Sequence, residues 1–497
     1  MRGQNNVKPH HEQSMLYYDF QVKTETGWDE ALGFSSLHEK KHIDEDSVCL
    51  DNIVFGWHPY WMGTAYEDYN YQLLSDIAYF SYEVNPFTGS YNDIHFWKTT
   101  NLIDLAQQAG TRVSLTVTLF DNHQAFLENS IARQTLIDSL TSLLEYRNAK
   151  GINIDFEGIP TSQKEKFTDF MIQLSTQLRE QITDVYISVA VPAVDWSGVF
   201  NSEELFHTAD LFIIMGYEYY WSSSPVAGPV APKNSGQIWG LWNATRSILD
   251  YLEAGIPGKK LCLGVPYYGY NWKVLNAGKG AATISRGDAV IYTNAKSNAD
   301  TYGRQWDNHA SVPYYEYYEN GVIAQTWYDD EVSLGFKYDL IHMLVLAGIG
   351  IWALGYDRNS NELWDLLKTK FSSCSGNSID GHVSDLGGPE GNYNAGISWD
   401  YQIPTTDSLV IHLLHRNLEL SQGDTLRIYS SDSLIQTFTF NSDSEGMIKT
   451  FAPLKLAFTA YSDENAAGWE MNWFVSEGDS IGFELSGDTI EENVPGG

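Results

Sequence analysis

The sequence predicts an α/β protein, a (β/α)8 TIM barrel with a small α+β insertion, followed by a C-terminal all-β sandwich. Three observations lead to this prediction. Short apolar runs rich in β-branched residues alternate with amphipathic stretches between residues 53 and 371. The composition changes sharply after Phe371. From residue 397 onward, alternating apolar and polar residues recur between turn clusters, with no helical pattern between them.

Eight apolar runs have the length and composition of strands. They are IVFGW at 53–57, DIAYFSY at 76–82, RVSLTVTLF at 112–120, GINIDFE at 151–157, VYISVAVP at 185–192, DLFIIMGY at 210–217, LCLGVPYYGY at 261–270 and GIGIWALGY at 348–356. Amphipathic stretches such as 161–182, 237–254 and 333–347 lie between them and predict helices. Eight strands that alternate with helices make up a closed parallel barrel. A doubly wound open sheet shares this alternation and is the alternative fold.

One gap, between the seventh and eighth runs, is much longer than the others. Its residues 273–330 are rich in Gly, Asn, Tyr and Thr and include strand-like pieces such as GVIAQTWYDD. Loops at the catalytic rim of a barrel tolerate growth. We therefore expect a small inserted subdomain there.

The predicted domain organisation follows from these patterns. Residues 1–48 are polar and weakly patterned, and their structure is not predicted. The barrel occupies 49–371, a Ser/Gly/Asp-rich linker 372–396, and the sandwich 397–497.

Composition excludes several classes of protein. Of the 497 residues 43% are hydrophobic, which excludes general disorder, and no apolar run reaches the roughly 18 residues of a membrane helix. The net charge of -34 repels phosphate backbones, so neither nucleic acid nor an anionic membrane surface is an expected partner. The high aromatic content of 14% suits either stacking on sugars or large aromatic cores.

The cysteines and the first residues bear on the cellular compartment. Cys49, Cys262 and Cys374 are too few for a disulfide framework and lack zinc-ligand spacing. The opening MRGQNNVKPHHEQ has no apolar core of a signal peptide. We expect a secreted or cell-surface protein whose signal lies outside this sequence.

The run GINIDFE carries the candidate chemistry. Alternate residues of a strand point the same way, so Asn153, Asp155 and Glu157 share one face, which in a barrel is the interior. Barrel enzymes keep their catalysts at the C-terminal ends of strands. Neighbouring carboxylates push their pKa values apart, so that one can hold a proton while the other stays charged. Glu157, the outermost, is the natural proton donor and should face the open mouth of the barrel. A satisfied structural carboxylate network is the alternative.

This segment resembles the DGxDxDxE signature of glycoside hydrolase family 18, the chitinases and endo-β-N-acetylglucosaminidases. The glycine, last aspartate and glutamate of the signature fall on Gly151, Asp155 and Glu157. Lys150 and Asn153 stand where the family usually has Asp. Asn153 can still donate a hydrogen bond to Asp155, in place of the usual shared proton.

Other segments between 53 and 371 resemble the same family in order. FGWHPYW is similar to its first strand, MGYEYYW at 215–221 to its sixth-strand MxYD motif, LGVPYYGYNW to its seventh strand and GIWALGYD to its eighth. The SxGG of the third strand is not recognisable in RVSLTVTLF. Under this resemblance Trp352 would form the floor of the sugar cleft and Glu218 would be the acid that follows Tyr217. Trp57, Tyr268 and Trp221 lie near strand ends and could extend the cleft. Taken alone, each aromatic could equally pack in the core, and Glu218 could be an ordinary surface carboxylate.

The resemblance implies a retaining, substrate-assisted hydrolysis. Glu157 would protonate the glycosidic oxygen, and the substrate's 2-acetamido oxygen would attack the anomeric carbon. Asp155 would hold the acetamide N–H, and Tyr217 would donate to the acetamide oxygen. Asn153 would support Asp155. No metal or other cofactor is needed for this catalysis.

The C-terminal sandwich resembles a CUB-like domain. Under this resemblance Glu419, Asp424 and Asp463 stand where such domains carry acidic calcium ligands, and carboxylates that converge at a loop end suit Ca²⁺. The usual CUB disulfides are absent. Three solvated carboxylates are the alternative reading in a chain this acidic. The domain could contact a glycan or the cell surface.

The sequence thus predicts a hydrolase of β-1,4-linked N-acetylglucosamine glycans, with chitin or chitooligosaccharides preferred over peptidoglycan and N-glycan cores. A chitinase-like carbohydrate-binding protein without turnover is the second hypothesis. A surface adhesion protein led by its C-terminal domain is the third.

Overall fold

The computed structural model describes two compact units, and each is considered by itself. In the first unit the described residues are 10–18, 22–33, 48–200, 203–236, 238–358 and 360–372. In the second they are 380–384, 398–403, 410–420, 422–430, 433–439, 442, 446–451, 454–460 and 468–476. Among these residues, no helix is both long and apolar enough to traverse a lipid bilayer.

The first unit is a closed barrel of eight parallel strands, which confirms the predicted fold over the open sheet. Its strands are β1 (Ile53–Pro59), β2 (Asp76–Glu83), β3 (Arg112–Leu119), β4 (Gly151–Phe156), β5 (Tyr186–Pro192), β6 (Leu211–Met215), β7 (Leu261–Pro266) and β13 (Gly348–Trp352). Almost every residue in them is buried. Closure leaves no unpaired edge and brings all eight C-terminal ends to one rim.

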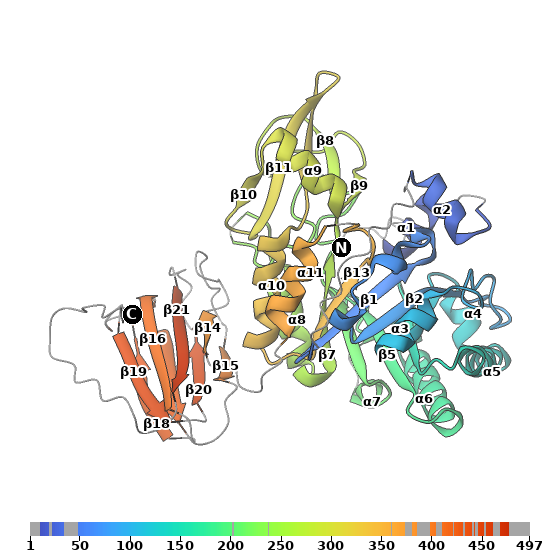
Figure 1. The fold of residues 1–497 in the computed structure, drawn as a ribbon, viewed down its shortest axis with the longest axis horizontal. Coiled ribbons are helices and arrows are strands. Elements are labelled where there is room, and N and C mark those ends of the chain that lie inside the picture. Colours follow the sequence, from blue (N-terminus) through green and yellow to red (C-terminus); the bar gives the residue numbers. More distant parts are fainter. Residues whose placement is uncertain are drawn as a thin grey trace, which may run out of the picture. The chain divides into compact units, whose positions relative to one another are not determined.

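Helices surround the barrel on its outside (Figure 1). They are α3 (Leu102–Ala109), α4 (His123–Leu127), α5 (Ser130–Arg147), α6 (Lys164–Gln181), α7 (Glu203–Phe206), α8 (Ala244–Glu253), α10 (Glu331–Met343) and α11 (Glu362–Phe371). Helix α6 buries a stripe at helical spacing that includes Phe167, Phe170, Met171, Leu174 and Leu178. Local sequence sets the helix starts: the Asn129 side chain accepts hydrogen bonds from two backbone N–H groups at the start of α5.

The predicted insertion between the seventh and eighth barrel strands is present. It contains β8 (Tyr268–Val274), β9 (Asp288–Ile291), α9 (Tyr292–Tyr302), β10 (Gln305–Asp307), β11 (Val312–Glu319) and β12 (Val322–Trp327), with the antiparallel order β10-β11-β12-β8-β9. It begins at Tyr268, inside the run 261–270 assigned above to one barrel strand. That run divides because residues up to Pro266 pair with β13, whereas residues from Tyr270 onward pair with β12.

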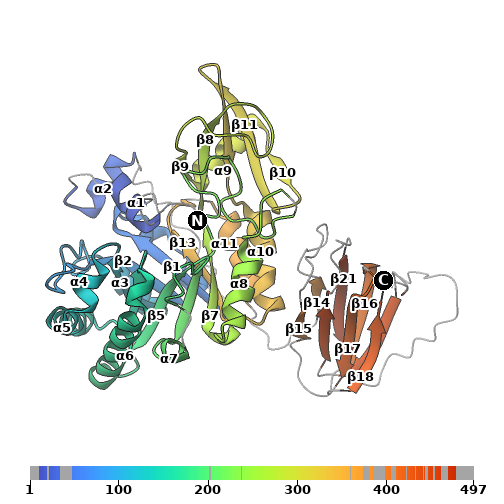
Figure 2. The ribbon, with the colours of Figure 1, turned by 180° about the vertical axis from the view of Figure 1, so that it is seen from behind.

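Two short helices precede the barrel, in a region for which the sequence predicted no structure. Helix α1 (His10–Tyr17) and helix α2 (Glu25–Ala31) lie at the same end of the barrel as the insertion (Figures 1 and 2). Helix α2 is anchored firmly. Trp28 is buried against Tyr60, and the Asp29 carboxylate accepts hydrogen bonds from the Thr64 backbone N–H at 3.1 Å and hydroxyl at 2.8 Å.

The second unit consists of two four-stranded antiparallel sheets. One has the order β14-β21-β16-β19 and the other β15-β20-β17-β18. The strands are β14 (Asp380–Ser384), β15 (Ser398–Ile403), β16 (Val410–Glu419), β17 (Thr425–Ser430), β18 (Ser433–Phe438), β19 (Gly446–Phe451), β20 (Leu454–Thr459) and β21 (Gly468–Ser476). Strand β14 lies within the predicted linker 372–396 and pairs with β21, so the second unit begins earlier than predicted. The CUB-like identity stays a prediction.

Candidate active site

The polar row on β4 lies inside the barrel, as the alternation predicts. Asn153 and Asp155 are fully buried, and the Glu157 side chain, just past the end of the strand, is 9% exposed. Local sequence fixes both ends of the strand. A Cβ at Gly151 would lie 2.0 Å from Ser114 Oγ, so only glycine fits there. Gly158 turns the chain with a φ of 77° directly after Glu157.

Asn153 bridges neighbouring strands. Its side-chain oxygen accepts a hydrogen bond from Trp57 Nε1 at 2.8 Å, and its amide donates to Ser188 Oγ at 2.9 Å. The expected hydrogen bond from Asn153 to Asp155 is therefore wrong. Residues two apart on a strand are separated by about 6.6 Å, whereas Ser188 is the register partner of Asn153 on the next strand. Asn153 thus fixes the Trp57 side chain and links β4 to β5.

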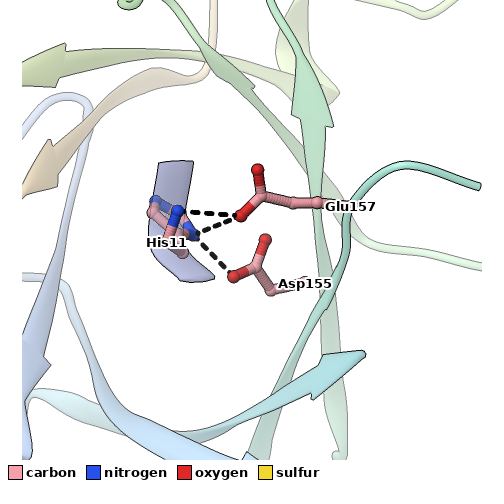
Figure 3. A group of neighbouring side chains, drawn as sticks. All are labelled: His11, Asp155 and Glu157. Atoms are coloured by element: carbon pink, nitrogen blue, oxygen red, sulfur yellow. Dashed lines mark hydrogen bonds and ion pairs between the residues drawn. The ribbon is translucent and has the colours of Figure 1, made fainter. Parts of the chain in front are cut away.

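Glu157 and Asp155 do not face an open mouth, because a side chain from α1 faces both carboxylates at close range (Figure 3). His11 Nδ1 lies 2.6 Å from Asp155 Oδ2 and 3.3 Å from Glu157 Oε1. The backbone N–H of His11 donates to Glu157 Oε1 at 3.2 Å. The prediction of an unobstructed site is thus corrected: the position next to the two carboxylates is occupied by the chain itself.

The side chains of Tyr217 and Trp352 contact the same His11 ring. The His11 ring stacks on Trp352 with centroids 3.8 Å apart, and His11 Nε2 lies 3.1 Å from the Tyr217 hydroxyl. Burial, reinforced by Asp155, raises the pKa of Tyr217 well above its usual value, so its hydroxyl keeps its proton. In the neutral imidazole tautomer that fits both contacts, the Tyr217 hydroxyl donates to Nε2 and His11 Nδ1–H donates to Asp155. The four predicted contacts of an acetamido sugar surround one imidazole.

The other predicted cleft residues lie around this centre. Glu218 has a left-handed φ of 63° and accepts a hydrogen bond from the Tyr268 hydroxyl at 2.8 Å. Tyr268 is buried and packs edge-on against Tyr217. Trp57 is buried edge-on against Trp352, and Trp221 is half-buried. Trp57 therefore supports Trp352 from within the core.

Lys150, which stands where the family has Asp, lies outside the site. It is exposed, precedes β4 and donates to the backbone oxygen of Thr183 at 3.1 Å. The substitution of Lys for the usual Asp therefore affects the N-terminal end of β4 and leaves the row of Asn153, Asp155 and Glu157 intact.

A cavity of about 230 Å³ adjoins the centre. Helix α1 and the insertion form much of its wall, and Trp352 and Tyr356 line it as well. Its full lining is Gln13, Ser14, Tyr17, Tyr18, Ser222, Tyr268, Tyr270, Arg286, Gly287, Asp288, Ala289, Ile291, Trp352 and Tyr356.

The residues present give little support to a metal at the centre. Within the described part of the chain, His11, Asp155 and Glu157 are the only group whose ligand atoms converge closely. However, the 2.6 Å between His11 Nδ1 and Asp155 Oδ2 is a charge-assisted hydrogen bond, and it leaves no space for an ion to bind both atoms. In the C-terminal unit Asp424 is buried, whereas Asp463 and the side chain of Glu419 lie outside the described residues. The calcium site stays a prediction.

The closed barrel, with acidic side chains at the C-terminal end of one strand, has the architecture of a barrel enzyme. A family model described as "Glycosyl hydrolases family 18" matches residues 56–357, more than half of the chain. The chain belongs to glycosyl hydrolase family 18.

Curated proteins are similar to this chain in sequence. A cortical fragment-lytic enzyme of Bacillus anthracis is 25% identical over 313 residues, which are 60% of this chain and 69% of that protein. A di-N-acetylchitobiase of Mus musculus is 26% identical over 275 residues, 48% of this chain and 72% of that protein. The chain thus spans about two thirds of the length of the curated relatives it matches.

Solved structures show the same fold. A family 18 chitinase of Cycas revoluta in complex with (GlcNAc)3 aligns with a TM-score of 0.56 at 19% identity, over 64% of this chain and 99% of that one. The spore cortex-lytic enzyme SleL of Bacillus cereus aligns with a TM-score of 0.54 at 20% identity, over 64% and 74%.

His11 is the residue at this site that sequence reasoning missed. It lies 144 residues from Asp155 in the chain and belongs to a segment without a strong pattern. A short polar helix that docks through one side chain leaves no periodicity to detect. The only signal was the presence of imidazole groups in an otherwise unassigned stretch.

Proposed function

We propose that this chain hydrolyses β-1,4-linked N-acetylglucosamine glycans by a retaining, substrate-assisted mechanism, with Glu157 as acid and base. One observation carries the proposal. The buried His11 ring presents an N–H to Asp155, an acceptor to Tyr217 and a flat face to Trp352. A 2-acetamido sugar offers the same combination: an N–H, a carbonyl oxygen and a ring face.

The placement of the two carboxylates suits the sugar's own acetamide as nucleophile. Two carboxylates that work as acid and protein nucleophile flank the scissile bond. Asp155 and Glu157 instead reach the same nitrogen from one strand. Asp155 is thus suited to hold the acetamide, whose oxygen attacks the anomeric carbon and gives an oxazolinium ion.

Burial assigns the two acids different tasks. Asp155 is fully buried and would stabilise the positive charge that develops on the acetamide. Glu157 is the outer residue and keeps some exposure, so it can exchange protons with water between the two steps. Tyr217 remains a donor over the working pH range because burial raises its pKa.

A neutral glycan fits this molecule best. The net charge of -34 opposes the approach of anionic polymers, and among the described residues that line the cavity Arg286 is the one cationic side chain. Chitin and chitooligosaccharides are therefore the preferred substrates. Peptidoglycan-derived glycans are the second candidate, favoured by the likeness to cortical fragment-lytic enzymes. Hydrolysis rates measured on chitotriose, on a muramic acid-containing glycan and on an N-glycan core would show which of these substrates is preferred.

The decisive variant is Glu157→Gln, assayed on fluorogenic chitobiose and chitotriose glycosides. Loss of a general acid costs at least about 10² in rate. The matched control is Glu165→Gln, which makes the same change on the exposed first turn of α6 and should keep the wild-type rate. Equal rates for Glu157→Gln and wild type would remove Glu157 from the mechanism. Tight sugar binding without turnover by the wild-type protein would favour a non-hydrolytic carbohydrate-binding protein.

A further inference from the structure

The segment that carries His11 behaves as a ligand of the barrel. His11 is fully buried, and so is Trp352 beneath it. A ring centroid distance of 3.8 Å is that of two rings in direct contact. No pyranose can stack on this face of Trp352 while His11 is there. An acetamido sugar and His11 therefore exclude each other.

His11 also satisfies the polar groups that a sugar would otherwise satisfy. A buried carboxylate without partners carries a large desolvation cost. His11 donates to Asp155 from its ring and to Glu157 from its backbone, and it accepts from Tyr217. His11 thus supplies a hydrogen-bond partner to one oxygen of each carboxylate and to the Tyr217 hydroxyl.

The rest of α1 is short and only partly buried. The helix has only eight residues, and isolated helices shorter than about 12–15 residues are marginal in water. Leu16 and Tyr17 are 51% and 64% exposed. The described contacts beyond His11 include Gln13 Oε1, which accepts from Ser222 at 3.2 Å, and Tyr18, which stacks on Trp61 at 5.1 Å.

When residues 10–18 leave the site, the attached helix α2 keeps them close to the barrel. Trp28 and Asp29 fix α2 to the residues after β1, independently of His11. Rebinding of α1 is therefore an intramolecular event with a high effective concentration. Departure of α1 would also remove the wall formed by Gln13, Ser14, Tyr17 and Tyr18, and so join the cavity of about 230 Å³ to the sugar site.

We propose that residues 10–18 form an autoinhibitory segment, in which His11 occupies the acetamide position and must leave before a sugar can bind. This inference rests on the proposed function, because it takes the blocked site to be the sugar site. Substrate then competes with the segment, and the apparent affinity for sugar falls by the ratio of closed to open molecules.

The test compares full-length wild type, His11→Ala and Leu16→Ala on a fluorogenic chitobioside. His11→Ala removes the ring that fills the site, so KM should fall at least about tenfold with little change in kcat. Leu16→Ala shortens an exposed side chain of the same helix and should match wild type. A KM for His11→Ala that is unchanged or raised would overturn the proposal, since a positioning role for His11 predicts loss of activity.

Two further readouts do not depend on turnover. Amide hydrogen exchange in residues 10–18 should accelerate at least about tenfold in His11→Ala, and tri-N-acetylchitotriose should bind that variant at least about tenfold more tightly than wild type. If no variant turns over substrate but both readouts change, hydrolysis fails as the function while the inhibitory segment stands. Unchanged exchange, or equal or absent binding in the two proteins, contradicts the segment's role.

Discussion

Two buried acidic centres in the barrel unit are neutralised in different ways. In one, Asp329 pairs with Lys337 of α10, both are almost fully buried, and Ser333 donates to the same carboxylate. In the other, Asp155 and Glu157 contact His11, which belongs to a short helix whose last two residues, Leu16 and Tyr17, are exposed. The first partner belongs to a packed helix of the barrel and cannot leave without unfolding it. The second can leave, which is what a site that must accept a ligand requires.

The largest effect, a loss of stability, is expected when the buried pair of Asp329 and Lys337 is broken. Lys337→Met leaves Asp329 buried without its counter-charge, and burial already raises the pKa of Asp329 while Lys337 lowers it. Breaking a buried ion pair from one side costs about 3–5 kcal/mol. We expect this loss in the free energy of unfolding, measured by denaturant titration.

The double variant Lys337→Met with Asp329→Asn is the control for that prediction. It removes the uncompensated charge and should recover part of the loss. A single variant that loses less than about 1 kcal/mol would show that the two centres do not differ in the way described.

The next effect concerns catalysis at the exchangeable centre. Asp155→Asn keeps the shape of the side chain but removes the charge that would stabilise the acetamide in the transition state. Loss of one such electrostatic group costs about 10²–10³ in kcat. We expect that loss on chitotriose and a much smaller one on any glucoside that lacks the acetamide. Equal losses on the two sugars would argue against substrate assistance.

The smallest effect concerns the pH dependence of stability. It comes from His58, a buried group without a counter-charge, which can be compared with the two paired centres. His58 is fully buried, its Nδ1 lies within hydrogen-bond distance of the Tyr69 hydroxyl at 2.8 Å, and burial lowers its pKa to about 3. Since the unfolded chain takes up a proton near pH 6.5 and the folded chain does not, unfolding is favoured as the pH falls from about 6.5 towards 3.

Between pH 7 and pH 5 this difference amounts to about 2 kcal/mol. The variant His58→Gln keeps an acceptor for Tyr69 but does not titrate, so its stability should fall less over that interval. The measurement is the free energy of unfolding of both proteins at the two pH values. Parallel curves would show that His58 titrates in the folded protein as it does in the unfolded chain.

The fold and the β4 row could be predicted because both depend on short-range patterns. Alternation along GINIDFE places Asp155 and Glu157 on one face, and the same rule predicts the barrel interior. The contact partner of Asn153 was predicted wrongly because it depends on strand register, which a single strand does not specify. His11 was missed for a stronger reason. Its position results from tertiary docking across 144 residues, and nothing in the local sequence of residues 10–18 encodes it.

The most direct measurement is a crystal structure of Glu157→Gln with tri-N-acetylchitotriose. We expect a sugar ring stacked on Trp352, its acetamide between Asp155 and Tyr217, and His11 displaced from that position. A complex in which His11 still stacks on Trp352 while the sugar lies elsewhere would contradict both the sugar site and the segment that covers it.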